Sequence, residues 1–520
     1  MVTSCSNSSK YTLQKSLSDN KRIAKNTLFL YFRSILLIII SLYTTREILK
    51  VLGVDDYGIY QLIGGMVAMF AMLSGSMSSA SQRFITYALG RENKDDVKKV
   101  FATSITLHII IGALLILILE VCGVYFLYNY LEIPDGRLTA AFWTLQCSIL
   151  AFYLNIISVP YNSLIIAYER MEAFAYISIF DGVLKLLPVY LLYIISFDKL
   201  VVYSIAILFS SGLVRLLYTI YCKRQFEEAK RVKLGIEKQC FREMASFAGW
   251  NIWGSGSVVL RNQGIDVLMN VFFGVTINAA KGLCNQVQNA VYQFVTNFQS
   301  AVNPQLTKSV AQHDLVRTHT LIFQGSRFSF YLLMLLSVPL ILHIQYVLSL
   351  WLVDVPDFTV YFIQWTMVYL LFDTQSRFLI ISIMAIGKIR NYQIVVGGIK
   401  MLALPIVYVC FKLGIGPLAG IWVNILLECV CLVFRLRYNS KLLNMNVGRY
   451  IIEVIFRCWS VFIIALSVSR LLMEILPLHS VLEIFISVLI SVGTIYIMGI
   501  KGRERVFVFA KVKAIIKIRG

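Results

Sequence analysis

Long apolar segments recur along the whole chain, and they constrain the fold more than any other feature. Fourteen mainly apolar runs alternate with short polar stretches. Because the hydrocarbon layer of a bilayer is about 30 Å thick, a helix needs roughly 20 apolar residues to cross it. Only 15% of the 520 residues are charged, against about a quarter in a soluble domain. The sequence therefore predicts an all-α integral membrane protein without a soluble domain.

We expect about fourteen transmembrane helices, each bounded by polar or turn-forming residues. They lie near residues 26–45, 59–82, 101–127, 138–166, 173–196, 200–222, 244–273, 277–303, 319–345, 358–386, 391–412, 415–436, 450–474 and 480–500. A polar arm precedes them at 1–25, a linker separates the first six spans from the rest at 223–243, and a basic tail follows at 501–520.

The distribution of Lys and Arg predicts the orientation. The N-terminal arm, the even-numbered loops and the tail hold 33 of the 48 Lys and Arg residues, whereas the odd-numbered loops hold six. Because basic residues concentrate in cytoplasmic loops, we expect both termini in the cytoplasm. The net charge of +20 thus reflects topology and contact with membrane lipids, and no nucleic-acid partner is expected.

An internal repeat emerges when the chain is shifted by 221 residues against itself. Gly53-Val54 then falls on Gly274-Val275, and the second predicted span falls on the eighth. Six spans per unit is an even number, so the two units share one orientation and are related by an axis along the membrane normal. We expect an N-lobe at 26–222, a C-lobe at 244–436 and two additional spans within 450–500.

Charged residues at membrane depth are the candidate functional residues, because a charge at the bilayer centre costs about 2.5–3.5 kcal/mol on insertion scales. Nine bases and six acids fall there. Three acid and base pairs are spaced four residues apart, where side chains meet on one helix face, so ion pairing without a transport role is one interpretation of them. These pairs are Asp181 with Lys185, Asp373 with Arg377, and Glu453 with Arg457.

Spans 1, 7 and 8 hold charges that such pairing explains less well. These charges are Arg33, Arg261, Asp266 and Lys281. Span 8 also carries an amide at every fourth residue, namely Asn285, Asn289 and Gln293. A row of amides either bonds helices to one another or lines a hydrated path for a sugar. The path is the preferred interpretation, because span 7 is also unusually polar.

Several short segments carry a resemblance to a known family. They are Leu52-Gly53-Val54-Asp55-Asp56-Tyr57-Gly58-Ile59-Tyr60, Ala80-Ser81-Gln82-Arg83-Phe84, Val159-Pro160-Tyr161-Asn162 and Glu169-Arg170-Met171. With the layout of two six-helix lobes and two extra spans, the chain resembles the Wzx-type polysaccharide flippases. These belong to the MOP superfamily, which also holds the multidrug and toxin extruders (MATE) and the lipid II flippase.

The resemblance implies transport of an undecaprenyl-diphosphate-linked oligosaccharide across the bacterial inner membrane by alternating access of the two lobes. Such a step serves lipopolysaccharide (O-antigen), capsule or exopolysaccharide biosynthesis, with a polymerase and a chain-length regulator as expected partners. A diphosphate needs compensating cations, and Arg suits it through bidentate contacts. The expected headgroup contacts are Arg33, Arg261 and Lys281, followed by Arg377 and Lys185. Asp266 and Asp373 would orient these cations or bind a coupling H⁺ or Na⁺.

Three alternatives remain open. A cation-coupled multidrug extruder should have a cavity dominated by acids, whereas bases outnumber acids at membrane depth here. A lipid II flippase differs chiefly in its glycan and is not separated by the sequence. A membrane-bound polysaccharide polymerase or glycosyltransferase needs a catalytic surface outside the bilayer, and the longest outer loops, near 128–137 and 346–357, offer little chemistry. The chain is therefore expected to be a transporter and not an enzyme, with no cofactor and no metal site.

Overall fold

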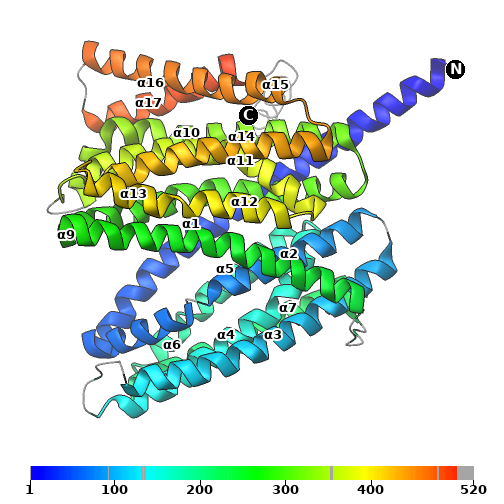
Figure 1. The fold of residues 1–520 in the computed structure, drawn as a ribbon. Coiled ribbons are helices and arrows are strands. Elements are labelled where there is room, and N and C mark those ends of the chain that lie inside the picture. The colour runs from blue at the N-terminus through cyan, green and yellow to red at the C-terminus, as the bar shows by residue number, and fades with distance from the viewer. Residues whose placement is uncertain are drawn as a thin grey trace, which may run out of the picture. The chain divides into compact units, whose positions relative to one another are not determined.

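The structure is a computed structural model of the 520-residue chain. It describes residues 2–500 except 69, 92, 130–132, 134–135, 196, 231, 233–234, 236, 352–354 and 477–478. In this part of the chain every regular element is a helix (Figure 1), which confirms the predicted all-α class. The predicted basic tail at 501–520 lies outside the described residues.

The helices follow one another with short connections. Their bounds are α1 (Val2–Ala68), α2 (Ala71–Gly90), α3 (Lys94–Asn129), α4 (Leu138–Ala167), α5 (Met171–Leu184), α6 (Leu187–Leu191), α7 (Lys199–Gln225), α8 (Glu227–Lys230), α9 (Lys238–Ala311), α10 (Leu315–Trp351), α11 (Thr359–Ile386), α12 (Arg390–Met401), α13 (Ala403–Lys412), α14 (Ala419–Leu443), α15 (Val447–Tyr450), the π-helix η1 (Ile451–Phe456), α16 (Arg457–Ile475), α17 (Ser480–Thr494) and the π-helix η2 (Ile495–Gly499).

Ten helical segments of the described chain are long and apolar enough to cross a membrane. They are Lys94–Asn129, Leu138–Ala167, Met171–Leu191, Lys199–Gln225, Leu315–Trp351, Thr359–Ile386, Arg390–Lys412, Ala419–Leu443, Val447–Ile475 and Ser480–Gly499. They coincide with ten of the fourteen predicted spans. The other four, at 26–45, 59–82, 244–273 and 277–303, fall on α1, α2 and α9, whose bounds differ from those of the predicted spans.

The predicted connection between spans 1 and 2 contains a kink that separates two helices, whereas the predicted connection between spans 7 and 8 is helical throughout. Helix α1 continues through the first of them and is broken only at Gly53, with φ 78° and ψ 174°, a conformation that glycine adopts without steric cost. Helix α9 continues through the second and ends at Ala311. Polar residues can be part of a helix wherever their side chains contact water or other polar groups. The polar residues between the predicted spans 7 and 8 therefore do not interrupt α9.

Two compact units make up the chain. Unit 1 contains Met1–Ser255 and Ser300–His313, and unit 2 contains Gly256–Gln299 and Asp314–Gly520. Helix α9 thus contributes its middle to unit 2 and both of its ends to unit 1. The division into lobes of six and six spans with two more stays a prediction.

Unit 1 is built around α4, which packs extensively against α7 and α3 and also contacts α2 (Figure 1). Its core contains large buried side chains such as Phe101, Tyr161 and Leu164. Many apolar side chains on its helices point outward instead, for example Leu117 and Leu216. An outward-facing apolar surface is what a bilayer solvates, whereas in water a patch of this kind would be a liability.

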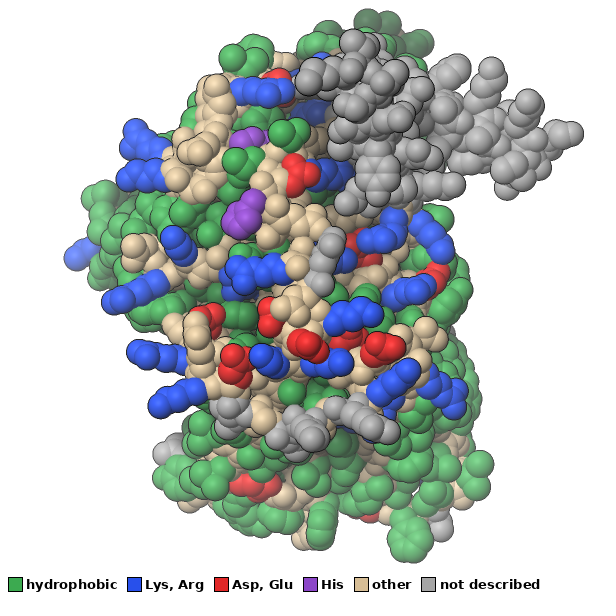
Figure 2. Space-filling model, turned by 90° about the vertical axis from the view of Figure 1, so that its right-hand side faces the viewer, with side chains coloured by type: hydrophobic (Ala, Val, Ile, Leu, Met, Phe, Trp, Pro, Cys, Tyr) green, Lys and Arg blue, Asp and Glu red, His purple; other side chains and the backbone are tan. Residues whose placement is uncertain are grey.

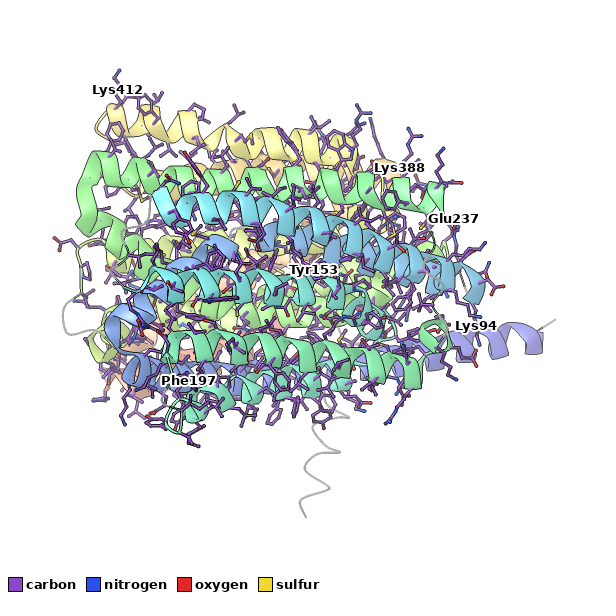
Figure 3. The ribbon with its side chains drawn as sticks, turned by 90° about the horizontal axis from the view of Figure 1, so that it is seen from below. Lys94, Tyr153, Phe197, Glu237, Lys388 and Lys412 are labelled. Carbon is purple, nitrogen blue, oxygen red and sulfur yellow. The ribbon has the colours of Figure 1, made fainter. Side chains whose placement is uncertain are left out.

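The two ends of the helix bundle differ in the loops that they hold. Figure 2 shows a face on which many Lys and Arg side chains gather, with Asp and Glu side chains among them. Within unit 1, Lys94 and Glu237, from even-numbered loops, lie at one end of the helices, and Phe197, from an odd-numbered loop, lies at the other (Figure 3). Within unit 2, Lys388 and Lys412 are separated in the same way (Figure 3). This alternation agrees with the predicted order of the spans.

An ion triad ties three helix ends together in unit 1. The guanidinium of Arg137 donates to Asp56 Oδ1 at 2.8 Å and to Asp198 Oδ2 at 2.5 Å. Asp198 also caps α7, since its side chain accepts from the backbone N–H groups of Leu200 and Val201. One acid of the motif at 52–60 therefore has a structural role, because it fixes α1 to the starts of α4 and α7.

A buried ion pair within α14 is joined by two residues of α12 in unit 2. Glu428 and Arg435 form an ion pair with side chains only 1% exposed, and Lys400 Nζ lies 3.7 Å from Glu428 Oε2. Arg435 Nε also donates to the hydroxyl of Tyr392 at 3.2 Å. Arg435 lies near the end of the predicted span 415–436, and α14 continues beyond that end to Leu443.

Removing Arg435 should therefore destabilise the protein strongly. Arg435→Met leaves the buried Glu428 carboxylate without its main partner, and breaking a buried pair in this way costs about 3–5 kcal/mol. The double variant Glu428→Gln with Arg435→Met should recover part of that loss, because the uncompensated carboxylate is removed and Lys400 is the one charge of this cluster that remains. Thermal unfolding of the purified protein in detergent measures both. A double variant that is less stable than Arg435→Met would contradict this reading.

Candidate functional site

A polar cavity of about 240 Å³ lies within unit 2, between α9, α11 and α14. Its lining consists of Arg261, Asn262, Gln263, Ile265, Asp266, Lys281, Asn285, Gln288, Asn289, Thr366, Tyr369, Ile421 and Asn424. Lys281, Asn285 and Asn289 follow one another at intervals of four residues, so α9 presents them on one face. The cavity is thus a direct product of the helical spacing in residues 281–289.

The charges of this cavity are two bases and one acid. Arg261 is 4% exposed, and its Nη2 donates to Asn262 Oδ1 at 3.0 Å and lies 3.5 Å from the hydroxyl of Tyr369. Lys281 and Asp266 line the same space, and within the described chain neither of them forms an ion pair shorter than 4.0 Å. The charged groups thus face the cavity with little mutual neutralisation, and the balance is positive.

Five of the predicted site residues come together in this cavity. They are Arg261, Asp266, Lys281, Asn285 and Asn289. The sequence did not single out Tyr369 and Asn424, which α11 and α14 contribute. A single Tyr or Asn in an apolar span does not indicate a binding site by sequence alone. These two residues reach the cavity only because three helices pack together. Gln293, one turn beyond Asn289 on α9, is not part of the lining.

Two other predicted site residues of unit 2 form a compact network instead. Arg377 Nε donates to Asp373 Oδ2 at 2.7 Å, as the spacing predicted. The hydroxyl of Tyr292 donates to the same oxygen at 2.6 Å, and Arg377 lies over the Tyr292 ring, 5.2 Å from its centroid. The Asp373 side chain is 4% exposed. This pairing accounts for both charges without a ligand, and neither residue lines the cavity.

The remaining two predicted site residues, Arg33 and Lys185, belong to unit 1. Arg33 lies over the ring of Phe174, 4.7 Å from its centroid. Its Nε is buried and has no hydrogen-bond partner among the residues that the structure describes. Lys185 forms the predicted pair with Asp181 at 2.8 Å, partly exposed. Arg33 is thus a deep cation of unit 1 for which the described chain shows no ion pair.

The third predicted pair is wrong. Glu453 pairs with Arg449 at 3.0 Å, and Arg457 Nε donates instead to the carbonyl of Met498 at 2.8 Å. Residues 451–456 form the π-helix η1. A π-helix adds a residue to the turn, so the register between positions 453 and 457 differs from the α-helical spacing on which the prediction depended.

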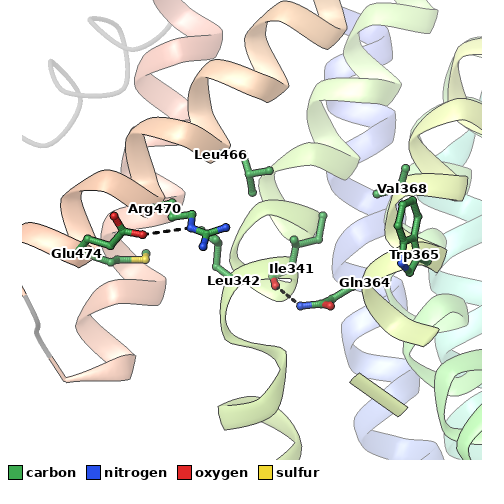
Figure 4. A pocket seen from close by; sticks show the side chains of 9 residues that line it. Ile341, Leu342, Gln364, Trp365, Val368, Leu466, Arg470 and Glu474 are labelled. Atoms are coloured by element: carbon green, nitrogen blue, oxygen red, sulfur yellow. Dashed lines mark hydrogen bonds and ion pairs between the residues drawn. The ribbon is translucent and has the colours of Figure 1, made fainter. Parts of the chain in front are cut away.

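A second and larger cavity in unit 2, of about 590 Å³, lies where α10, α11 and α16 meet (Figure 4). Its walls are mainly apolar, with Ile341, Leu342 and Trp365 among them. Its polar groups bond to protein partners: Gln364 Nε2 donates to the Ile341 carbonyl at 2.9 Å, and Arg470 pairs with Glu474 at 3.3 Å (Figure 4). Since its charges are already paired, the smaller cavity is the better candidate for an ionic ligand.

The fold is that of the MATE transporters of the MOP superfamily. The chain superposes on a MATE transporter in complex with MaD3S with a TM-score of 0.69 at 12% identity, covering 82% of this chain and 97% of that one. An outward-facing multidrug resistance MATE transporter matches with a TM-score of 0.69 at 10% identity, over 82% and 96% of the two chains. A MOP superfamily transporter from Pyrococcus furiosus matches with a TM-score of 0.68 at 11% identity, over 82% and 97%.

Sequence comparison agrees with the fold. Residues 28–191 match the family model MatE, whereas no curated protein matches the chain by sequence. Members of this family are transporters and not enzymes, which supports the expectation that the chain is a transporter. The predicted MATE-like fold is thus confirmed, and the family match together with the apolar helices indicates a multi-pass membrane protein.

The two groups of charges in unit 2 should respond differently to mutation. Lys281→Gln should change the free energy of unfolding by less than about 0.5 kcal/mol, because Lys281 forms no ion pair with the residues that the structure describes. Arg377→Gln should cost about 1–3 kcal/mol, because it leaves the buried Asp373 carboxylate short of a donor. Chemical unfolding of the purified protein compares them. Equal losses of stability in the two variants would contradict the distinction between cavity and network.

Proposed function

We propose that the protein is a flippase that moves an undecaprenyl-diphosphate-linked oligosaccharide across the bacterial inner membrane. The observation that carries the proposal is the cavity of unit 2, in which Arg261 and Lys281 face a space lined by amides. A diphosphate supplies the negative charge that these cations lack, and charge-assisted contacts to phosphate oxygens are the strong class of hydrogen bonds. Both termini would be cytoplasmic, as the distribution of Lys and Arg predicts.

Besides the two cations, the cavity offers amide side chains that can bind a sugar. Asn285, Gln288 and Asn289 offer donors and acceptors next to the cations, and sugar hydroxyls need both. We assign the diphosphate to the cations and the adjacent sugar to the amides. Asp266 orients the cations or binds a coupling H⁺ or Na⁺. Arg33 is a further proposed headgroup contact, considered within unit 1 alone, while Arg377, Lys185 and Asp373 support the helices that carry them.

Transport would proceed by alternating access of two lobes. One of the similar structures is the MOP superfamily transporter from Pyrococcus furiosus. The description of that structure states that the reverse polarity of its binding pocket suggests a different function. The fold therefore accommodates pockets of different charge, and the positive balance of this cavity favours an anionic substrate. The product would enter lipopolysaccharide, capsule or exopolysaccharide biosynthesis, with a polymerase and a chain-length regulator as partners.

A cation-coupled multidrug extruder is the second candidate. It is favoured by the likeness to a multidrug resistance MATE transporter and by Asp266, an acid in the cavity without an ion pair in the described chain. A lipid II flippase remains a third candidate, because its substrate shares the diphosphate and polyprenyl parts.

Glycan export in a strain that lacks the native protein tests the proposal. Arg261→Ala and Lys281→Ala should each lower export, since the loss of one charge-assisted contact costs about 1.5–3 kcal/mol, roughly a 10- to 100-fold loss of affinity. Lipid-linked oligosaccharide should accumulate on the cytoplasmic side. Arg470→Gln is the matched control, since Arg470 lies in the other cavity of unit 2 and its side chain is 75% exposed. Unchanged export in the Arg261 and Lys281 variants, with altered resistance to cationic dyes, would favour the extruder.

A further inference from the structure

The short turn between α4 and α5 holds a buried carboxylate that the proposed transport site does not use. The side chain of Glu169 is 1% exposed, although it lies in a turn. Arg22 Nε donates to its Oε2 at 2.6 Å, and Lys308 Nζ donates to its Oε1 at 2.8 Å. Gln305 Nε2 lies 3.2 Å from Oε2. Donors from α1 and from the end of α9 thus converge on one carboxylate, all within unit 1.

The backbone at this turn is also unusual. Glu169 has φ 59°, in the left-handed region that residues other than glycine rarely adopt and that costs about 1–3 kcal/mol. Its carbonyl accepts from Asn26 Nδ2 at 3.2 Å. The strained conformation directs the side chain inward to the two cations, and the contacts of the side chain and the carbonyl offset the strain.

The charge and exposure of Glu169 and its two cations are compatible with a contact that can form and break. Burial raises the pKa of Glu169, but the Lys308 ammonium and the Arg22 guanidinium outweigh it and hold the pKa below its usual value. The carboxylate is therefore ionised at neutral pH. The side chains of Arg22 and Lys308 are 50% and 24% exposed, so both cations have access to water. Separation of the partners would let water replace the lost contacts.

A tight helix contact lies beside the carboxylate. A Cβ atom added to Gly90, at the end of α2, would lie 2.8 Å from Ala311 Cβ and 3.1 Å from the Cα of Lys308. Position 90 and position 311 differ by 221 residues, which is the offset of the internal repeat. Two positions related by a twofold axis touch each other only near that axis. The ends of α2 and α9 thus meet where the two halves of the repeat would meet.

Helix α9 has a weak point just before this contact. Pro304 lies inside the helix, where a proline removes one backbone hydrogen bond and permits bending. It lies close to Ser300, at which α9 passes from unit 2 into unit 1. The segment from Ser300 to Ala311 can therefore pivot without unwinding the rest of α9.

We propose that Glu169 is a latch that holds the C-terminal end of α9 against the turn between α4 and α5, and that this latch releases once in each transport cycle. The inference rests on the proposed function only in that it needs alternating access. By the predicted topology the latch lies on the cytoplasmic side. Its closed form keeps this end of the bundle shut, and the loss of the two cation contacts lets the segment 300–311 move away.

Cysteine labelling tests the latch without any substrate. Thr307 is 4% exposed and close in size to cysteine, so Thr307→Cys reports whether this segment leaves its buried position. In inside-out vesicles, maleimide labelling at position 307, measured by mass spectrometry of the peptide, should be slow when Glu169 is intact. Glu169→Gln and Lys308→Gln should each accelerate it at least fivefold, and Lys308→Arg, which keeps the charge, should leave it slow.

Glu172→Gln is the matched control, because Glu172 pairs with Lys25 at 2.9 Å on the surface nearby and should not affect labelling. Rapid labelling with Glu169 intact, no acceleration in the two latch variants, or the same acceleration in the Glu172 variant would overturn the proposal.

The two proposals fail in different ways. If the latch is wrong, the labelling rates do not depend on Glu169, whatever the substrate. If the flippase function is wrong, the labelling pattern still appears, but a strain lacking the protein does not accumulate lipid-linked oligosaccharide.

Discussion

The free-energy cost of a charge in the bilayer governs most of this structure. On insertion scales such a charge costs about 2.5–3.5 kcal/mol at the helix centre, so each deep charge needs a partner or a wet surface. Unit 2 shows both solutions. Glu428 and Arg435 are paired and almost completely buried, and Asp373 is held by Arg377 and Tyr292. Arg261, Asp266 and Lys281 instead line a cavity. In the proposed function, these cavity charges are the groups that contact the substrate.

Apolar periodicity was sufficient to predict the helices, because a span needs a fixed length of apolar chain whatever its neighbours are. The i,i+4 pairs at 181 and 373 also followed from the sequence, since both partners share one helix. Predictions that depended on the exact helix register or end failed. Glu453 lies in a π-helix, and α14 continues to Leu443, beyond the predicted end of its span at 436. Tyr369 and Asn424 join the cavity only through the packing of α11 and α14 against α9, which no local pattern encodes.

The fold by itself leaves the substrate open, because the solved structures that share it include a multidrug resistance transporter and a transporter with a pocket of reverse polarity. Function must therefore be argued from the site. In this chain the site combines two cations, one acid and a row of amides, a chemistry suited to a phosphorylated sugar. The latch at Glu169 adds a different element, because it concerns how the bundle opens and not what it binds. Both depend on α9, which belongs to unit 2 in its middle and to unit 1 at its ends.

The most direct test of this account is binding to the purified protein, measured by native mass spectrometry with three probes: a polyprenyl diphosphate sugar, the matching polyprenyl monophosphate and a cationic dye. The account predicts that the diphosphate binds most tightly and that Arg261→Ala weakens it by about 10- to 100-fold, the equivalent of one lost charge-assisted contact. Preferential binding of the cationic dye, abolished by Asp266→Asn and unaffected by Arg261→Ala, would contradict the account and assign the cavity to cation extrusion.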